Sequence, residues 1–497
     1  MGDEIGSSQF SDEDYQAYYA QLEIETLTLE KKFNEKKLSS ISNYCGLEQE
    51  AWILNSDNFP VPENQFLLDS LNNSLLSPEL AQFNIELNVT PQLLTSDGLS
   101  KMQSELEALW NLCDSKLQKK NLHMEMIGIL PTVRDAELIV KNMSSMKRYR
   151  ALNEQVLKSR NGEALSLNIV GIEHLKSTHN DVMLESAATS LQLHRQIESD
   201  SSARYYNTAI ILSAITVAIS ANSPLLFGKQ LWEETRIPLF EQAVDVGGYG
   251  NAMHGPIKRV SFGSGYVRNS IFECFSENLE HYPVLLPVKL DKADNKFPYL
   301  RMHNGTIWRW NRPIIGFDED GTTHLRIEHR VMSAGPTIID EISNAAFFYG
   351  LQEFFANHPV QAEKLLSFSE AKNNFYTAAQ HGIESKINWP SLDNKKLVKI
   401  SIRKLIKTEL LQCSRQGLES LGIDKHDIDR YLEVIEGRVS TGQTGSAWQK
   451  SYLLSNGFRE NISDLDASDG NMDVMKSLIE AYSKNRLIGN PVHMWPL

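Results

Sequence analysis

Four segments of the chain alternate apolar and polar residues with the period of a β-strand. They are residues 46–53, 83–89, 191–197 and 325–331. Because successive side chains of a strand point to opposite faces, each segment predicts a strand with one apolar and one polar face. The polar faces carry acidic, amide, imidazole or guanidinium groups, namely Glu48, Glu50, Asn84, Glu86, Asn88, Gln192, His194, Arg326, Glu328 and Arg330.

Two interpretations of this alternation are open. An ordinary antiparallel sheet with one solvated face alternates in the same way, and that account suffices for any single segment. Solvated strand faces, however, favour residues such as Thr over repeated Glu. Carboxylates that converge on one surface repel each other unless cations lie between them. Together the four segments therefore favour a site for hard cations and phosphate.

The rest of the chain predicts further strands and helices, and a division of the protein into three parts. We expect a helix over residues 11–38, and two strands within 300–335 joined by a turn at 318–321, where Asp-Gly is typical of a hairpin. The chain is expected to be mostly helical from 336, and the glycine-rich stretch 246–251 to be a mobile loop. The predicted parts are a helical extension (1–40), a catalytic α+β domain (41–345) and a helical part packed on it (346–497). The other predicted elements are strands near 43–54, 82–90, 122–130, 164–172 and 188–198 and helices near 96–118, 134–160 and 202–220.

Composition excludes several classes of partner. The formal charge of −14 argues against general binding to nucleic acid or to an anionic membrane, although a local basic pocket is compatible with it. The four cysteines form no C-x-x-C pair, so no zinc knuckle is indicated. The longest apolar run, near 209–221, is too short to span a bilayer. The acidic start of the chain has no apolar core typical of a signal peptide, so we expect a cytoplasmic protein without membrane contact.

Three further segments have alternative interpretations. Residues 438–446 resemble a phosphate-binding loop in composition, but they lack the Gly-Lys-Ser/Thr ending, so a flexible connection is favoured. Residues 303–313 are either a hairpin with its tryptophans in the core or a segment in which Arg309 and Arg312 bind a carboxylate or phosphate. Lys147, Arg148 and Arg150 are interpreted as a solvated helix face.

An ordered set of short motifs resembles the glutamate–cysteine ligase family, in the branch with bacterial carboxylate–amine ligases. The motifs are Gly-Leu-Glu-Gln-Glu at 46–50, Asn-Ile-Glu-Leu-Asn-Val-Thr-Pro at 84–91, Ala-Thr-Ser-Leu-Gln-Leu-His at 188–194, Ala-Asn-Ser-Pro at 221–224, Arg-Val-Ser at 259–261 with Gly-Tyr at 265–266, and Arg-Ile-Glu-His-Arg at 326–330. The resemblance implies an α+β fold like the catalytic domain of glutamine synthetase, with a curved, mainly antiparallel sheet and helices on its outer face. The concave face would hold ATP and two or three Mg²⁺ ions, for which Mn²⁺ may substitute.

The same resemblance implies an activity and roles for individual residues. A carboxylate of glutamate would attack the γ-phosphate of ATP to give an acyl phosphate, from which an amine displaces phosphate. Arg330, Arg259 and Glu50 are the implied catalytic residues, Arg330 near the transferring phosphoryl group and Arg259 on a substrate carboxylate or phosphate. The implied metal ligands are Glu48, Glu50, Glu86 and Glu328. Gln192 or His194 matches a position at which relatives place a metal- or nucleotide-contacting side chain. Arg309 and Arg312 are added as candidate nucleotide contacts from the chemistry of their own segment.

Several functional alternatives stay open. In the narrow version of the ligase hypothesis the amine acceptor is cysteine, and in the wider version it is another amine. Both stay open because no residue of the sequence specifies a thiol-bearing acceptor. The partners are small molecules in both versions, and a homo-oligomer is compatible with either. A nucleotide-binding regulatory homologue without turnover is a second class of function. A metal-dependent hydrolase that uses His179 and His194 is a third, although it lacks a further paired ligand.

Overall fold

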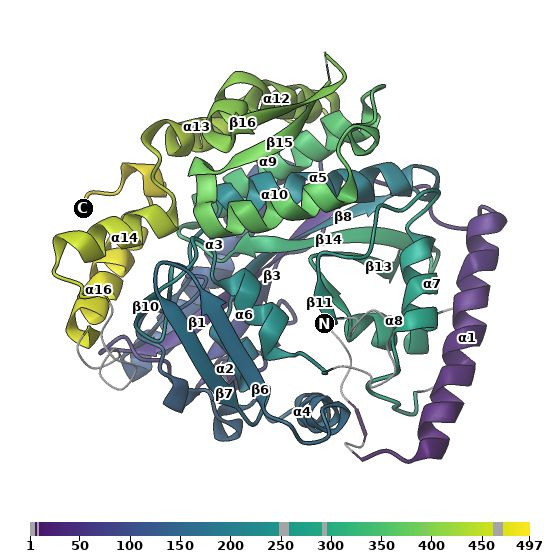
Figure 1. Cartoon of the computed structure of the whole chain (residues 1–497), viewed down its shortest axis with the longest axis horizontal. Helices are drawn as coiled ribbons and strands as arrows, with labels where there is room; N and C mark the ends of the chain where they lie inside the picture. The colour runs from purple at the N-terminus through teal and green to yellow at the C-terminus, as the bar shows by residue number, and fades with distance from the viewer. Residues whose placement is uncertain (1–4, 7–8, 248–257, 291–295, 393, 461–470) are drawn as a thin grey trace.

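A curved antiparallel sheet forms the centre of the molecule (Figure 1). The computed structural model describes residues 5–6, 9–247, 258–290, 296–392, 394–460 and 471–497. Among these, six strands pair in the order β13, β14, β8, β1, β3, β2, while β4 and β5 also pair with β1. The predicted α+β class with a curved, mainly antiparallel sheet is confirmed. The strands are β1 (Tyr44–Asn55), β2 (Leu76–Pro78), β3 (Asn84–Asn88), β4 (Gln92–Leu93), β5 (Leu122–Glu125), β8 (Ser190–Ile197), β13 (Asn311–Phe317) and β14 (Thr323–Ser333).

The strand register brings the polar positions of distant segments onto one face. Glu50 lies opposite Glu86 across the β1–β3 pair, and Glu48 lies opposite Gln192 across the β1–β8 pair. His194 lies opposite Glu328 across the β8–β14 pair. Directly opposite residues of an antiparallel pair share a face, so these side chains all project from the same side of the sheet. The shared polar face that the alternation predicts is therefore present.

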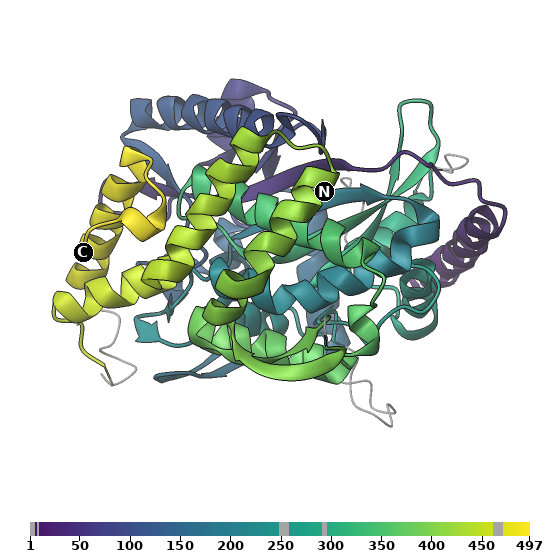
Figure 2. The same cartoon turned by 90° about the horizontal axis from the view of Figure 1, so that it is seen from above.

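The opposite face of the sheet is covered by two layers of helices. Helices α5 (Ser202–Ile219) and α9 (Ile338–Asn357) contact each other, and α5 packs on β14. Both are buried on nearly every side, because an outer layer packs over them. Figure 2, seen from the helical side, shows the light-green α12 and α13 in front of the green α9 and teal α5. The other covering helices are α3 (Gly98–Leu117), α10 (Phe368–His381), α12 (Leu411–Ser420) and α13 (Lys425–Thr441).

The polar face is partly enclosed by elements from the middle of the chain, below the sheet in Figure 1. The predicted strand at 164–172 belongs to a separate hairpin of β6 and β7 and not to the main sheet. The predicted helix at 134–160 forms only from Lys147, and its first part consists instead of two short 3-10 turns, Asp135–Glu137 and Val140–Asn142. The elements on this side are α2 (Asn64–Leu71), α4 (Lys147–Ser159), β6 (Leu165–Val170), β7 (His174–His179) and α6 (Arg236–Ala243).

A second, smaller hydrophobic core lies at the N-terminal edge, where α1 (Asp12–Asn34) packs against α7 (Phe272–His281) and α8 (Pro298–Gly305). The hydroxyl of Tyr18 donates to the backbone oxygen of Tyr299 at 2.7 Å. A capping box at Ser11 begins α1, and the helix ends before Lys36, whose φ is +54°. The N-terminal helix is thus tied to the wall of the same body that holds the sheet.

The last third of the chain is mostly helical, as predicted, but a hairpin of β15 (Lys386–Ser391) and β16 (Lys396–Ser401) interrupts it. Most of residues 438–446 are not a loop: α13 ends at Thr441, Gly442 caps it with a φ of +82°, and the Thr444 hydroxyl caps α14 (Gly445–Ser455). No helix in the described part of the chain is long and apolar enough to cross a membrane. The remaining elements include α11 (Ile402–Leu405), the π-helix Ile406–Leu410, α16 (Met472–Ile488), and the short pairs β9 (Leu225–Leu226) with β10 (Lys229–Gln230) and β11 (Val260–Ser261) with β12 (Trp308–Arg309).

Two expectations are not tested by this architecture. The predicted loop at 246–251 lies, from residue 248 on, outside the described residues. The predicted domain boundaries at 40 and 345 stay predictions, and residue 345 falls within α9.

Candidate functional site

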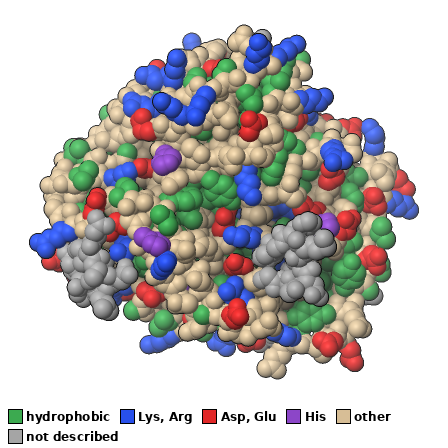
Figure 3. Space-filling view, in the orientation of Figure 1, with side chains coloured by type: hydrophobic (Ala, Val, Ile, Leu, Met, Phe, Trp, Pro, Cys, Tyr) green, Lys and Arg blue, Asp and Glu red, His purple; other side chains and the backbone are tan. Residues whose placement is uncertain are grey.

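A cavity of about 290 Å³ opens on the polar face of the sheet. Strands β1, β3, β8, β13 and β14 supply its charged floor, and α4, α6, α7 and α8 supply mostly apolar walls. Acidic and basic side chains lie close together near the centre of the face seen in Figure 3. The cavity is therefore amphipathic, with charged groups at the sheet and apolar groups around them.

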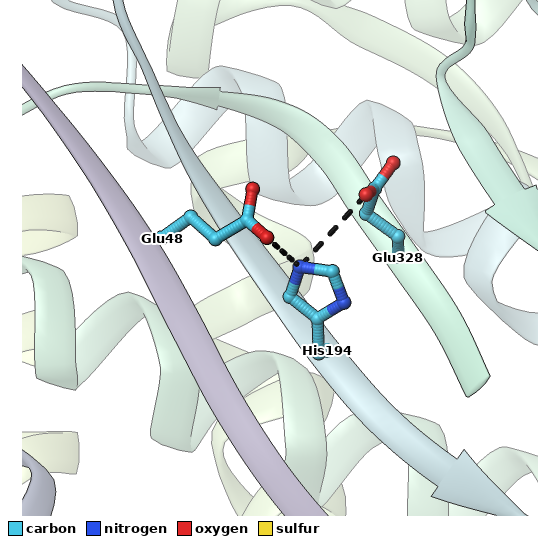
Figure 4. Close-up of side chains that lie close together, drawn as sticks. All are labelled: Glu48, His194 and Glu328. Carbon is cyan, nitrogen blue, oxygen red and sulfur yellow. Dashed lines mark ion pairs between the residues drawn. The ribbon is translucent and has the colours of Figure 1, made fainter. Parts of the chain in front are cut away.

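The first group of residues that could hold a metal ion consists of Glu48, His194 and Glu328, here called the histidine cluster (Figure 4). The Nε2 atom of His194 lies 3.1 Å from a Glu48 oxygen and 3.8 Å from a Glu328 oxygen. One ligand atom from each residue falls within 4.8 Å of the others. The three strands β1, β8 and β14 contribute one residue each, so the geometry of this cluster is set by the sheet register.

Positive charge surrounds the histidine cluster. Arg312 donates two hydrogen bonds to Glu328, at 2.8 and 3.0 Å, and Arg330 donates a third at 2.9 Å. Burial raises the pKa of Glu328, but the charges of Arg312 and Arg330 outweigh it and hold the pKa well below its usual range. Burial also opposes ionisation of Glu48, yet the charge of His194 lowers its pKa to about 2. Both carboxyl groups are therefore ionised at neutral pH.

The second group consists of Glu50, Glu79 and Glu86, here called the carboxylate cluster, whose oxygens also lie within 4.8 Å of one another. Glu50 accepts hydrogen bonds from the backbone of Ser190 and from the Gln192 amide, each at 2.7 Å. Burial, and then the charge of Glu48, raise the pKa of Glu86 to about 8. Burial, and then the charges of Glu50 and Glu86, raise the pKa of Glu79 well above its usual value. Glu79 and Glu86 therefore keep their protons at neutral pH, because burial and neighbouring carboxylates oppose their ionisation.

Both clusters fit a hard divalent cation. Mg²⁺ takes oxygen ligands and is commonly held by a few carboxylates together with substrate phosphates. The carboxylate cluster offers oxygen donors only, and Oε2 of Glu86 is buried without a hydrogen-bond partner. A buried carboxylate oxygen without a donor is costly, and a bound cation would remove that cost. The histidine cluster adds one imidazole nitrogen, a ligand that Mn²⁺ also accepts.

A chain of hydrogen bonds connects the two clusters. Arg330 donates both to Glu328 and to the Gln192 side-chain oxygen, and the Gln192 amide donates to Glu50. Gln192 is thus fixed between the clusters. The Arg330 guanidinium therefore lies between Glu328 of the histidine cluster and Gln192, the neighbour of Glu50.

Comparison with known proteins identifies a family and a shared fold. The family model of glutamate–cysteine ligase family 2 (GCS2) matches residues 44–468. The chain belongs to this family. A glutamate–cysteine ligase of Francisella tularensis, solved in complex with AMP, is similar with a TM-score of 0.53 and 12% identity, over 93% of this chain and 96% of that one. A bifunctional glutathione synthetase of Pasteurella multocida is similar with a TM-score of 0.54 and 11% identity, over 93% of this chain and 55% of that one. At these identities the likeness shows a shared fold. A comparison with curated proteins gives no match.

Two arginines predicted as site residues do not line the cavity. Arg259 donates to the backbone oxygen and hydroxyl of Thr306, at 3.0 and 3.1 Å. Arg309 donates to Asn278 at 2.6 Å and to Glu277 at 2.9 Å. Both guanidiniums are buried in the wall behind the cavity, so the structure does not bring them to the other candidates.

The remaining predicted site residues meet at the cavity, together with residues that the sequence did not indicate. Arg312 lines the cavity. Trp310, two residues earlier, is only 1% exposed and belongs to the hydrophobic core. Arg148, interpreted as solvated, also lines the cavity, whereas its neighbours Lys147 and Arg150 are exposed. The residues brought together as predicted are Glu48, Glu50, Glu86, Gln192, His194, Arg312, Glu328 and Arg330.

Two glutamates of the cavity were missed. Glu79 follows the three-residue strand β2, whose Ser77 pairs with Glu86, so strand parity places it beside the cluster. Glu185 lies in the 3-10 turn Met183–Ala187, and burial followed by the charge of Glu50 raises its pKa to about 8. The alternation of β2 would place Glu79 on this face. The strand has only three residues and ends in proline, so its alternation cannot be recognised in the sequence alone.

The hydrolase alternative has no support in this arrangement. His179 lies on β7, where its ring nitrogens approach Ser177 at 2.7 Å and Asp135 at 3.3 Å. Among the described residues, it belongs to neither ligand cluster and does not line the cavity with His194.

Proposed function

We propose that the protein is an ATP-dependent carboxylate–amine ligase that forms a γ-glutamyl amide, with glutamate and cysteine as its first-choice substrates. The supporting observation is that two ligand clusters and two arginines lie side by side on one sheet face. Phosphoryl transfer needs little covalent help from a protein, and its barrier falls through positioning and neutralisation of charge. The cavity supplies both requirements.

The two clusters have different parts in this proposal. Glu48, His194 and Glu328 would hold one divalent cation, and Glu50, Glu79 and Glu86 a second. Bound Mg²⁺ would neutralise the oxygens of the β- and γ-phosphates. The family resemblance gave Glu48, Glu50, Glu86 and Glu328 this role, and the geometry adds Glu79.

The reaction is proposed in two steps. In the first, an oxygen of the substrate carboxylate attacks the terminal phosphorus of ATP, the bond to the bridging oxygen breaks, and ADP leaves. Arg330 would stabilise the charge on the transferring group, because its guanidinium lies between Glu328 and Gln192. In the second, the amine attacks the acyl carbon, loses a proton, and phosphate leaves. Apolar side chains of the walls, such as Phe240 and Trp308, would limit the access of water to the acyl phosphate.

A product assay tests the proposal. The purified chain is incubated with ATP, Mg²⁺ and glutamate, with cysteine or with a panel of other amino acids and amines, and ADP and the amide are both measured. We expect ADP and amide to form in equal amounts. If amines other than cysteine are used and cysteine is not, the acceptor assignment is wrong and the wider ligase stands. If the chain binds nucleotide but no acceptor supports ADP release, the ligase proposal itself is wrong and the regulatory alternative holds.

A further inference from the structure

The segment that follows α10 concentrates positive charge. Residues 384–408 contain seven basic and two acidic side chains, in a chain whose formal charge is −14. Six of the seven basic residues are lysines, and all six are exposed. In Figure 3, Lys and Arg side chains gather along the upper edge of the molecule, where Figure 1 shows the β15–β16 hairpin and α12. The six lysines lie along this hairpin, on α11 and on the π-helix, and are here called the lysine patch: Lys386, Lys395, Lys396, Lys399, Lys404 and Lys407.

The lysine patch has no ion-pair partner in the described part of the chain. Glu384, the described carboxylate of this segment, is paired with Arg403 at 2.8 Å. Arg403 also donates to the backbone oxygens of Val439 and Ser440, at 2.9 and 2.8 Å, so its guanidinium connects α11 to the end of α13. No ion pair among the described residues reaches any of the six lysines. Their positive charge is therefore directed to the solvent.

The hairpin presents apolar side chains among these lysines. The register of β15 and β16 places Lys386, Leu397 and Lys399 on the same face. Trp389 belongs to the opposite face and is fully buried, so the lysine face is the outer one. Leu397 and Val398, in the middle of β16, are 38% and 37% exposed. Lysines around two exposed aliphatic side chains would suit a partner surface that is negatively charged and has an apolar layer beneath its charges.

Protection of a free sheet edge explains only part of the lysine patch. β16 pairs only with β15 among the described strands, so its outer edge is free. Lysines on such an edge commonly prevent pairing with another chain. That account covers Lys396 and Lys399. It does not explain Lys386 on the neighbouring strand, or Lys404 and Lys407 beyond the end of β16.

A nucleic acid is a less suitable partner than a lipid surface. Nucleic-acid recognition uses the bidentate fork of arginine and stacking on exposed aromatic rings. The arginine of this segment, Arg403, is engaged within the protein, and the aromatic residue of the segment, Trp389, is buried. Lysines with aliphatic neighbours are instead typical of peripheral binding to anionic lipid.

We propose that the lysine patch docks the protein on an anionic lipid surface, with Leu397 and Val398 entering the headgroup layer. Clusters of about four to eight Lys or Arg are typical of segments that bind phosphatidylserine. The acidic remainder of the surface opposes docking only weakly, because charges are screened over about 8 Å at physiological ionic strength. The whole-chain charge, from which we expected no membrane contact, therefore does not describe this local surface.

The lysine patch is separate from the candidate active site. None of its residues lines the cavity, so a docked membrane does not occupy the site. The inference therefore goes beyond the proposed function and does not depend on it.

Co-sedimentation of the full chain with lipid vesicles tests the proposal. One set of vesicles is made of phosphatidylcholine alone, and the other of phosphatidylcholine and phosphatidylserine in equal amounts. We expect binding to the mixed vesicles only, and weaker binding as salt is added. Lys396→Gln/Lys399→Gln should lower the partition coefficient about 25-fold, at about fivefold per lysine. Leu397→Ser should lower it about threefold, because only part of this side chain is left to bury.

A matched double variant controls for net charge. Lys119→Gln/Lys484→Gln removes two exposed lysines outside the patch, on the 3-10 turn after α3 and on α16. It should bind the mixed vesicles as the wild type does. Both double variants should keep the wild-type melting temperature, because all four lysines are exposed. An equal loss of vesicle binding in both would overturn the proposal, since net charge and not the patch would then determine binding.

Two other results would also overturn the proposal. The first is a wild type that stays in solution with the mixed vesicles. If Lys396→Gln/Lys399→Gln then self-associates in size-exclusion chromatography, the lysines only protect the edge of β16. The second is tighter binding to a duplex oligonucleotide than to the mixed vesicles, lost in the same variant, which would assign the patch to nucleic acid. None of these measurements requires ligation, so the proposed function is tested separately.

Discussion

The two ligand clusters lie side by side on one sheet face, but their surroundings differ in charge. The histidine cluster is compensated within the protein, with Arg312 and Arg330 on Glu328 and His194 on Glu48. In the carboxylate cluster, no ion pair among the described residues reaches Glu50, Glu79 or Glu86.

The pKa directions follow this difference. The pKa values of Glu48 and Glu328 are lowered by neighbouring positive groups despite burial, whereas those of Glu79 and Glu86 are raised by burial and by neighbouring carboxylates. The histidine cluster is therefore organised before any ligand binds, and the carboxylate cluster depends on a cation to become fully ionised.

The largest expected effect is on catalysis, from Glu50→Gln. Glu50 belongs to the uncompensated cluster and is held by Ser190 and Gln192. Its loss should lower the rate of amide formation about 1,000-fold, as for removal of a group that stabilises the charge of the transition state. The variant should remain folded. Steady-state assays of ADP release measure this, and the exposed Glu154→Gln on α4 is the matched control. An unchanged rate in Glu50→Gln would remove Glu50 from the metal site.

The second prediction concerns stability and separates the clusters most directly. Glu328→Gln leaves Arg312 and Arg330 without their carboxylate, so the free energy of unfolding should fall by about 3 kcal/mol. Glu86 keeps its proton in the metal-free protein at neutral pH, so Glu86→Gln exchanges one neutral side chain for another and should leave the stability nearly unchanged. Denaturant unfolding without metal compares the two variants. Equal losses of stability would mean that the clusters do not differ in compensation.

The third prediction is a pH dependence of the metal-free protein. Glu86 and Glu185 have pKa values of about 8 in the folded state, against 4.5 for an ordinary glutamate. The folded state thus keeps protons that the unfolded state has already released, so stability is full at low pH and falls as the pH rises through 8. We expect the two groups together to cost about 3 kcal/mol of stability between pH 6.5 and 8. Thermal unfolding at both pH values measures it.

Magnesium should reverse that loss, because a bound cation favours the ionised carboxylates. The stabilisation by Mg²⁺ should be larger at pH 8 than at pH 6.5, and Glu86→Gln should reduce the difference. The same Mg²⁺ increment at both pH values would contradict the raised pKa of the carboxylate cluster.

The smallest expected effect is that of Glu79→Gln. Glu79 is less buried than Glu86 and lies just beyond the short strand β2, so it is the ligand with most freedom to move. Its loss should weaken the apparent affinity for Mg²⁺ about tenfold, with little change in the metal-free melting temperature. A Mg²⁺ titration of ligation rate shows this. A shift as large as that of Glu50→Gln would make Glu79 an equal partner in the cluster.

Much of the fold and of the site could be predicted from strand alternation, because a period of two determines which face a side chain takes. Glu48, Glu50, Glu86, His194 and Glu328 were found in this way, and the register then placed them together. Family resemblance added the activity, which alternation alone does not indicate.

The remaining site residues could not be predicted because their positions depend on tertiary structure. Glu185 lies in a 3-10 turn and Arg148 in the first turn of a helix whose start the sequence placed too early. Arg309 and Arg312 are three residues apart, yet one is buried against Glu277 and the other reaches Glu328. The two side chains take different directions because the chain turns between β12 and β13. The composition of the segment does not indicate this turn.

The most direct test of the two-cluster account is the binding of a non-hydrolysable ATP analogue measured by calorimetry with and without Mg²⁺. We expect binding that requires Mg²⁺ and that is lost in the double variant Glu48→Gln/Glu50→Gln, which removes one ligand from each cluster. Binding of equal strength without Mg²⁺, or in the double variant, would contradict the claim that these carboxylates hold the magnesium nucleotide.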